Sequence, residues 1–158
     1  MNPIQYFKAT EADIQTMVDS RIGFIVELSG PQSEEQTMLL KQQLEKYFSQ
    51  AIKQKLYICW IAKSENNIVG IGGMTIREQP GNFKNPSGKS GYIMNMYTVP
   101  RFRRKGICSM LLEKLTATAK EMGINAFELH ATKDGEPVYE KNGFHLHEQP
   151  TYRKYGNT

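Results

Sequence analysis

A cluster of cations precedes a glycine and an apolar helical pattern in the segment YTVPRFRRKGICSMLL, which spans residues 97–112. Four of the five residues from 101 to 105 are Arg or Lys, and Gly106 follows them. A helix N-terminus exposes unpaired N–H groups that carry partial positive charge, so it attracts anions. A glycine at that point lets a phosphate approach the backbone without a Cβ in the way. The pattern therefore favours a pyrophosphate ligand, while a solvated cationic surface is the plainer alternative.

The bulk composition is that of an ordinary globular chain of one domain. The 158 residues include 39% hydrophobic and 23% charged residues, and the net charge of +4 is modest. A local anionic ligand explains that surplus as well as nucleic acid would. No apolar run reaches membrane-spanning length, and residues 1–13 contain no apolar leader core. We therefore expect a cytoplasmic protein without a membrane partner.

Hydrophobic periodicity predicts the element order β, α, α, β, β, β, α, β, α, β. Capping boxes at Thr10 with Asp13 and at Ser33 with Gln36 mark the starts of the first two helices. Central hairpins followed by helical crossovers imply a mixed sheet with helices on both faces. Strands are expected at 4–10, 56–62, 68–76, 92–99, 126–131 and within 144–155, helices at 14–28, 33–51, 105–122 and 134–142, and a long loop at 78–91.

Two segments resemble motifs of the GNAT superfamily of N-acetyltransferases. Val99-Pro100 and the run RRKGIC at 103–108 resemble the acyl-CoA-binding motif [QR]-x-x-G-x-[GA], which follows a strand ending in V-x-P. The segment VYEKNGF at 138–144 resembles the C-terminal YEKxGF pattern of the same superfamily. Cys108 stands where the superfamily prefers Gly or Ala, and it is small enough to keep the helix close. The predicted element order agrees with the superfamily over nearly the whole chain.

The resemblance implies a single α/β (α+β) domain over residues 1–158, with a mixed, mostly antiparallel sheet, helices on both faces and a splayed strand at 92–99. Acetyl-CoA would be the co-substrate, with its pantetheine beside the splayed strand and no metal. A backbone N–H near Met96 or Tyr97 would face the thioester carbonyl. The residues expected at the cofactor are Tyr97, Thr98, Val99, Arg103, Arg104, Lys105, Gly106, Ile107, Cys108, Ser109 and Thr132.

The implied reaction is transfer of an acetyl group to a primary amine by direct attack. Tyr139 occupies the position of the superfamily's general acid, although an aromatic residue packed under the last helix is the alternative. The base is left open between Glu27 and Glu78, and each also fits a solvated carboxylate. Asn95 on the splayed strand is a candidate substrate contact, or a polar residue of an outward face.

Two other chemistries are disfavoured by the same sequence. Cys108 as the nucleophile of a covalent relay lacks a histidine partner motif. His145 and His147 lie two residues apart on one side of a predicted strand, and no third ligand has matching spacing. Direct transfer without a metal is therefore the expectation.

Two rival functions remain at this level. A small basic nucleic-acid-binding module would use the cations at 101–105 with YRKY at 152–155. It is disfavoured because those cations are confined to one turn before an apolar helix. A non-catalytic acyl-CoA sensor is the other rival, and the retained Tyr139 argues against it. We expect a small-molecule or peptide amine as acceptor, without nucleic acid, and a homodimer is compatible with this interpretation.

Overall fold

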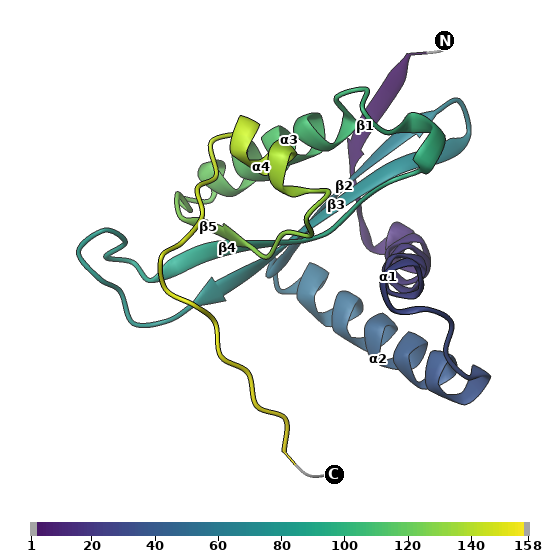
Figure 1. Cartoon of the computed structure of the whole chain (residues 1–158), viewed down its shortest axis with the longest axis horizontal. Coiled ribbons are helices and arrows are strands. Elements are labelled where there is room, and N and C mark those ends of the chain that lie inside the picture. Colours follow the sequence, from purple (N-terminus) through teal and green to yellow (C-terminus); the bar gives the residue numbers. More distant parts are fainter. Residues whose placement is uncertain (1–2, 157–158) are drawn as a thin grey trace.

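The computed structural model describes residues 3–156, in which a five-stranded mixed sheet lies between two layers of helices (Figure 1). The strands follow one another across the sheet in chain order, and every neighbouring pair is antiparallel except the parallel pair β4–β5. The strands are β1 (Ile4–Lys8), β2 (Tyr57–Ser64), β3 (Asn67–Glu78), β4 (Lys89–Thr98) and β5 (Phe127–Leu129). The helices are α1 (Ile14–Ser29), α2 (Glu34–Lys53), α3 (Ile107–Glu121) and α4 (Glu136–Lys141), with 3-10 turns at Glu11–Asp13 and Pro100–Phe102.

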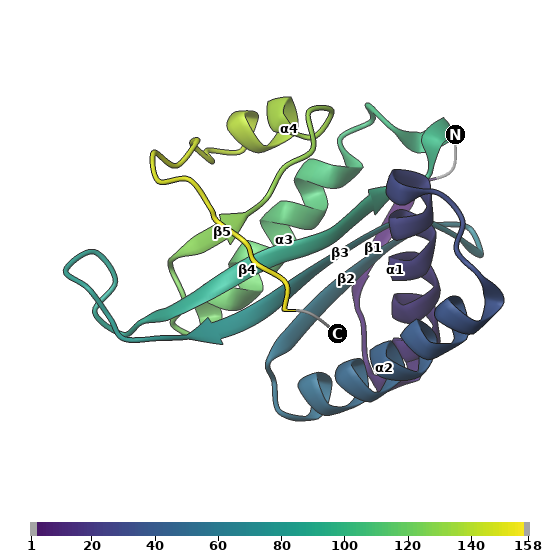
Figure 2. The same ribbon diagram turned by 60° about the horizontal axis from the view of Figure 1, so that its bottom comes forward.

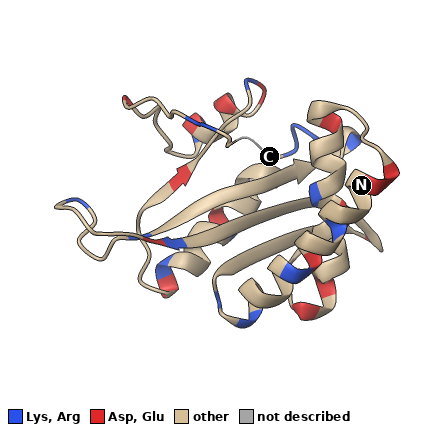
Figure 3. Ribbon diagram, turned by 90° about the horizontal axis from the view of Figure 1, so that it is seen from below, with Lys and Arg blue, Asp and Glu red and all other residues tan. Residues whose placement is uncertain are grey.

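Each face of the sheet has its own core. In Figure 1, α1 and α2 lie on one side of the sheet, and α3 and α4 lie on the other. Side chains of β2 alternate between the two cores: Tyr57 and Cys59 face α1 and α2, whereas Ile58 packs with α3. This alternation explains why the segment LYICWIA at 56–62, which was predicted as a strand, is apolar throughout. Figure 3 shows that most Lys, Arg, Asp and Glu residues lie on helices, loops and strand ends.

The predicted start signals of the first two helices are confirmed. Thr10 and Ser33 both form capping boxes, with Asp13 and Gln36 as their partners. Helix α1 ends at Gly30, whose φ of +81° is a left-handed value that favours glycine. Local hydrogen bonds define these boundaries, so sequence alone was sufficient to find them.

The final strand or hairpin predicted within 144–155 is wrong. After α4, the described chain up to residue 156 contains no helix or strand. Leu146 is 96% exposed and Tyr152 is 90% exposed. Apolar and polar residues alternate in this segment, but the apolar ones do not form a buried face. Strand β5 has only three residues to offer as an edge, and Pro150 has no N–H to donate.

Candidate active site

Strand β4 contains a bulge at Asn95. Between the pairs Ile71–Tyr97 and Gly73–Met94, one residue of β3 lies opposite two residues of β4. Asn95 has a φ of +56°, in the left-handed region that asparagine tolerates better than most residues. A bulge of this kind bends a strand and redirects its peptide groups.

The bulge reverses which peptide groups of β4 face β5. Before it, the Gly91 N–H donates to the carbonyl just before β5, at 2.8 Å. After it, the Val99 N–H donates to Val69 of β3, at 3.0 Å. Successive peptide groups alternate in direction, so two odd-numbered residues should point the same way in an unbroken strand. The inserted residue therefore turns the peptide groups of Met96 and Thr98 away from β3.

Strands β4 and β5 separate close to this bulge, at what we call the β4–β5 divergence. Their pairing covers Gly91–Ile93 and Phe127–Leu129 only. Beyond it, β4 runs on to Thr98, whereas the chain after Leu129 leaves the sheet toward α4 (Figure 2). The splayed strand that the resemblance implied is thus confirmed, and the bulge together with the short β5 is its cause.

The loop between β4 and α3 presents peptide N–H groups beside the divergence. Arg104 and Gly106 have φ values of +61° and +79°. The first hydrogen bond of α3 runs from the Met110 N–H to the Gly106 carbonyl, at 3.0 Å. The amides of residues 107–109 therefore precede the helical ladder and point out of its N-terminus. A Cβ on Gly106 would meet no protein atom within 4 Å, so the positive φ is the local reason for glycine.

Arg103 joins this loop to α1. Its Nε donates to the Thr98 carbonyl and its Nη2 to a Glu27 carboxylate oxygen, both at 2.8 Å. The Arg103 guanidinium holds the pKa of Glu27 below its usual range, and the Tyr97 hydroxyl contributes to the same effect. Glu27 is therefore a weaker base than a free carboxylate, and its position ties α1 to the end of β4.

Tyr139 lies on α4 and packs against the face of the sheet that α3 covers. Its ring is 6.1 Å from that of Phe144, in an edge-on arrangement. Burial raises the pKa of the Tyr139 hydroxyl well above its ordinary value, with a smaller contribution from Cys108. Burial also raises the pKa of the Cys108 thiol, to about 11. Both groups therefore stay protonated at neutral pH, which suits a proton donor and not a thiolate nucleophile.

Two residues predicted near the acceptor have other places in the structure. Asn95 is 6% exposed, its Nδ2 donates to the Tyr57 hydroxyl at 2.9 Å, and its Oδ1 accepts from Arg21 at 2.8 Å. These bonds hold the bulge against α1. Glu78 lies opposite Lys89 in the β3–β4 register, at the other end of β4 from the loop before α3, so the fold does not bring it to the divergence.

Two residues predicted near the cofactor connect α4 to its neighbours. The Thr132 carbonyl accepts the Gly135 N–H at 2.9 Å and forms the turn that leads into α4. The Ser109 hydroxyl accepts from the Asn142 side-chain amide at 2.9 Å, which joins the first turn of α3 to the end of α4. Both contacts position Tyr139 relative to the N-terminus of α3.

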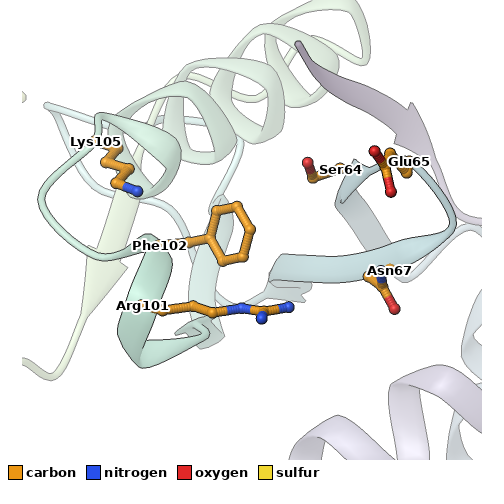
Figure 4. A pocket seen from close by; sticks show the side chains of 6 residues that line it. All are labelled: Ser64, Glu65, Asn67, Arg101, Phe102 and Lys105. Carbon is orange, nitrogen blue, oxygen red and sulfur yellow. The ribbon is translucent and has the colours of Figure 1, made fainter. Parts of the chain in front are cut away.

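A pocket of about 260 Å³ flanks the loop on the side of the β2–β3 turn. Lys105 points toward the Phe102 ring, with its Nζ 5.2 Å from the ring centroid, and Arg101 extends along the opposite side (Figure 4). A second pocket, of about 370 Å³, lies between α1 and the ends of β3 and β4 next to Tyr97. The first pocket is lined by Ser64, Glu65, Asn67, Arg101, Phe102 and Lys105.

Sequence reasoning missed a pair of side chains at the divergence. The Tyr92 hydroxyl lies 2.6 Å from Nδ1 of His130, and the two rings are 5.6 Å apart. Alternation in the AFELHA segment places His130 on the opposite face from the half-buried Leu129. The contact of His130 with Tyr92 could not be predicted, because it depends on the parallel pairing of β5 with β4.

Residues 3–156 contain neither a helix that could span a membrane nor a cluster of metal-ligating side chains. None of the helices there combines the length and the apolar character needed to cross a bilayer. In the same part of the chain, no three His, Cys, Asp or Glu side chains gather where they would share a metal ion.

The chain is similar in sequence and fold to known acetyltransferases. The model of the acetyltransferase (GNAT) domain family matches residues 27–156. The crystal structure of a predicted acetyltransferase with acetyl-CoA from Clostridium acetobutylicum is 31% identical, covers 96% of each chain and has a TM-score of 0.86. Among curated proteins, none matches significantly.

Two further structures share the fold at lower identity. A GCN5-related N-acetyltransferase from Ralstonia eutropha JMP134 is 21% identical, with a TM-score of 0.84 over 98% of this chain and 100% of the other. Glucosamine-6-phosphate N-acetyltransferase from Arabidopsis thaliana is 18% identical, with a TM-score of 0.72 over the same shares. The family match over most of the chain and the 31% identical relative confirm the resemblance: the chain belongs to the GNAT family of acetyltransferases.

Proposed function

We propose that the protein transfers an acetyl group from acetyl-CoA to a primary amine, which attacks the thioester directly. The β4–β5 divergence lies next to the N-terminus of α3, and this arrangement is the main support for the proposal. The relative from Clostridium acetobutylicum contains acetyl-CoA. An aminoglycoside acetyltransferase in complex with sisomicin and the glucosamine-6-phosphate enzyme share the fold, which supports an amine acceptor.

The cofactor would be held mainly by backbone groups. The pyrophosphate would accept hydrogen bonds from the amides of residues 107–109 and from the turn at Arg104 to Gly106. The pantetheine would lie along the open side of β4, where Met96 and Thr98 direct their peptide groups. The Val99 N–H is engaged by β3, so Val99 would contribute side-chain contact and not an amide hydrogen bond.

The reaction at the thioester requires stabilisation of the oxyanion, protonation of the leaving sulfur and deprotonation of the amine. The Met96 N–H would polarise the carbonyl oxygen and stabilise the oxyanion that forms. The Tyr139 hydroxyl would donate its proton to the departing CoA sulfur, consistent with the burial that raises its pKa. An alkyl amine has a pKa of about 10, so the acceptor must also lose a proton before or during attack.

Direct attack fits this site better than a covalent relay through Cys108. The Cys108 thiol has a pKa raised to about 11 by burial, so little thiolate exists at neutral pH. Cys108 would instead pack beneath the cofactor as a small apolar residue.

A panel of amines tests the proposed function. The purified protein is incubated with acetyl-CoA and polyamines, amino sugars, aminoglycosides or peptides, while free CoA and acetylated product are both measured. We expect at least one amine to yield CoA and acetyl-amine in equal amounts. Tight binding of CoA without product from any amine would favour the non-catalytic sensor and contradict the proposal.

A further inference from the structure

We propose that His130, held by Tyr92, accepts the proton of the attacking amine. This inference rests on the proposed amine transfer and names the base of that reaction. It replaces Glu27, whose carboxylate is paired with Arg103, and Glu78, which lies at the far end of β4.

The position of His130 follows from the alternation of side chains along β5. Phe127 and Leu129 pack on the core that α3 covers, so Glu128 and His130 face the side of α1 and α2. Leu129 is the last residue of β5 paired with β4, and its partner is Ile93. His130 is therefore the first residue beyond the pairing, directly at the β4–β5 divergence.

A contact with Tyr92 of β4 orients the imidazole, and Arg77 of β3 supports that contact. The Tyr92 hydroxyl lies 2.6 Å from Nδ1. The Arg77 guanidinium stacks 3.7 Å above the Tyr92 ring centroid and lies 3.6 Å from the Glu128 carboxylate. With Nδ1 donating to the Tyr92 oxygen, the lone pair of Nε2 is available to accept a proton.

The other nitrogen faces the C-terminal segment. Nε2 of His130 lies 3.5 Å from the Thr151 hydroxyl, a long contact that an incoming amine can displace. The groups in contact with the imidazole are thus the Tyr92 hydroxyl from β4 and the Thr151 hydroxyl of the C-terminal segment. Glu128, two residues earlier in the chain, is paired with Arg77. Arg77 of β3 acts on the imidazole through Tyr92.

The acid and the base lie on opposite faces of the sheet. Tyr139 belongs to the face that α3 covers, and His130 to the face of α1 and α2. A thioester in the divergence would present its sulfur to Tyr139 and its carbonyl carbon to an amine beside His130. The amine nitrogen bonds to the carbonyl carbon, and its proton passes to Nε2. The carbon–sulfur bond then breaks, and the sulfur takes the Tyr139 proton.

Turnover of the His130→Gln variant across pH tests the assignment. With an amine that the wild type acetylates, we expect kcat at pH 7 to fall about 10²-fold, the scale of a lost general base. The loss should shrink toward pH 9.5, because a larger share of the amine is then neutral in solution. His145→Gln is the matched control, because His145 is an exposed histidine on the C-terminal segment. This variant should behave like the wild type.

A second readout separates catalysis from structure. Calorimetry should give the same CoA affinity for His130→Gln and the wild type, and added imidazole should restore part of the turnover of His130→Ala. Unchanged kcat in His130→Gln, or a loss that is the same at every pH and resists imidazole, would overturn the assignment while amine transfer stands. Failure of the wild type to acetylate any amine would overturn the proposed function, and this inference with it.

Discussion

The burial of Tyr139 serves both its packing and its proposed role as a proton donor. Its ring fills space between α4 and the sheet, and the same burial keeps its hydroxyl protonated. A phenol that is excluded from water gives up its proton only when negative charge develops beside it, as on a departing thiolate. Burial thus keeps the proton on the Tyr139 hydroxyl until CoA departs, as its proposed role as an acid requires.

Replacing Tyr139 by Phe should separate these two contributions. The ring stays packed, so CoA affinity should remain near that of the wild type, while kcat falls about 10²-fold because the proton donor is lost. Steady-state kinetics with a responsive amine, under conditions where chemistry limits the rate, measure the effect. Tyr6→Phe removes another half-buried hydroxyl, on the opposite edge of the sheet, and is the control. Equal turnover of Tyr139→Phe and wild type would show that the hydroxyl is not the acid.

Glu27 should prove structural and not catalytic. Glu27→Gln is expected to leave kcat near the wild-type value, but to lower Tm at neutral pH by weakening the contact with Arg103. The folded pKa of Glu27 lies below its ordinary value of 4.5, so the carboxylate stabilises the fold above that pH. This contribution is lost as pH falls through the folded pKa, and the Tm values of the two proteins should then converge. A large loss of kcat, reversed at high pH, would restore Glu27 as the base.

Among the structural elements, the bulge in β4 connects the sheet to the proposed cofactor site. Asn95 adopts the left-handed conformation. Hydrogen bonds of its side-chain amide with Tyr57 and Arg21 anchor the bulge to the core. The resulting change of direction exposes the peptide groups of Met96 and Thr98. The polar side chain in an otherwise apolar strand is thus explained by backbone geometry.

Asn95→Gly and Asn95→Val test this explanation. Glycine accepts the positive φ but leaves the buried Tyr57 hydroxyl without its partner, so we expect a loss of about 1–3 kcal/mol with CoA affinity retained. Valine cannot adopt that φ without strain and should lose both stability and CoA binding. Denaturant unfolding and calorimetry measure the two quantities. An Asn95→Gly protein of wild-type stability with a raised KM for the amine would instead identify Asn95 as a substrate contact.

Helices, caps and most strands were predictable from sequence because they depend on local signals, such as the Ser33 capping box and the alternation along β2. The bulge was not predictable, since it depends on the register between β3 and β4. The same limit applies to the pairing of Arg103 with Glu27, 76 positions apart, and to the meeting of Tyr92 with His130. Each needs the tertiary arrangement that brings distant segments together.

At the scale of the whole molecule, the small positive net charge has a local explanation. The net charge is +4, and several of the cations lie in the loop before α3. Figure 3 shows that residues of both charge signs are spread over the helices. A dispersed pattern of this kind does not form the continuous basic face that a nucleic-acid-binding surface needs. The two cores leave the β4–β5 divergence at the edge of the sheet, where a cofactor can enter.

The effect of added ligand on Tm should distinguish CoA from nucleic acid as the ligand of this protein. CoA at about 100 times its Kd should stabilise the folded protein by about 2.7 kcal/mol, seen as a rise in Tm. A duplex or single-stranded oligonucleotide at physiological salt should leave Tm unchanged. A shift caused by the oligonucleotide that disappears steeply as salt is raised would support the nucleic-acid alternative.

Calorimetry on Gly106→Val and Gly123→Val tests whether the loop before α3 binds the pyrophosphate of CoA. Both glycines have a φ of +79° and a Cβ direction without protein atoms within 4 Å, so valine should impose a similar backbone cost at each. Only Gly106 lies at the N-terminus of α3, whereas Gly123 follows its C-terminal end. We predict that Gly106→Val loses most of its CoA affinity, and that Gly123→Val binds CoA like the wild type despite a comparable fall in Tm. Wild-type CoA affinity in folded Gly106→Val, or an equal loss in both variants, would show that the loop before α3 does not bind the pyrophosphate.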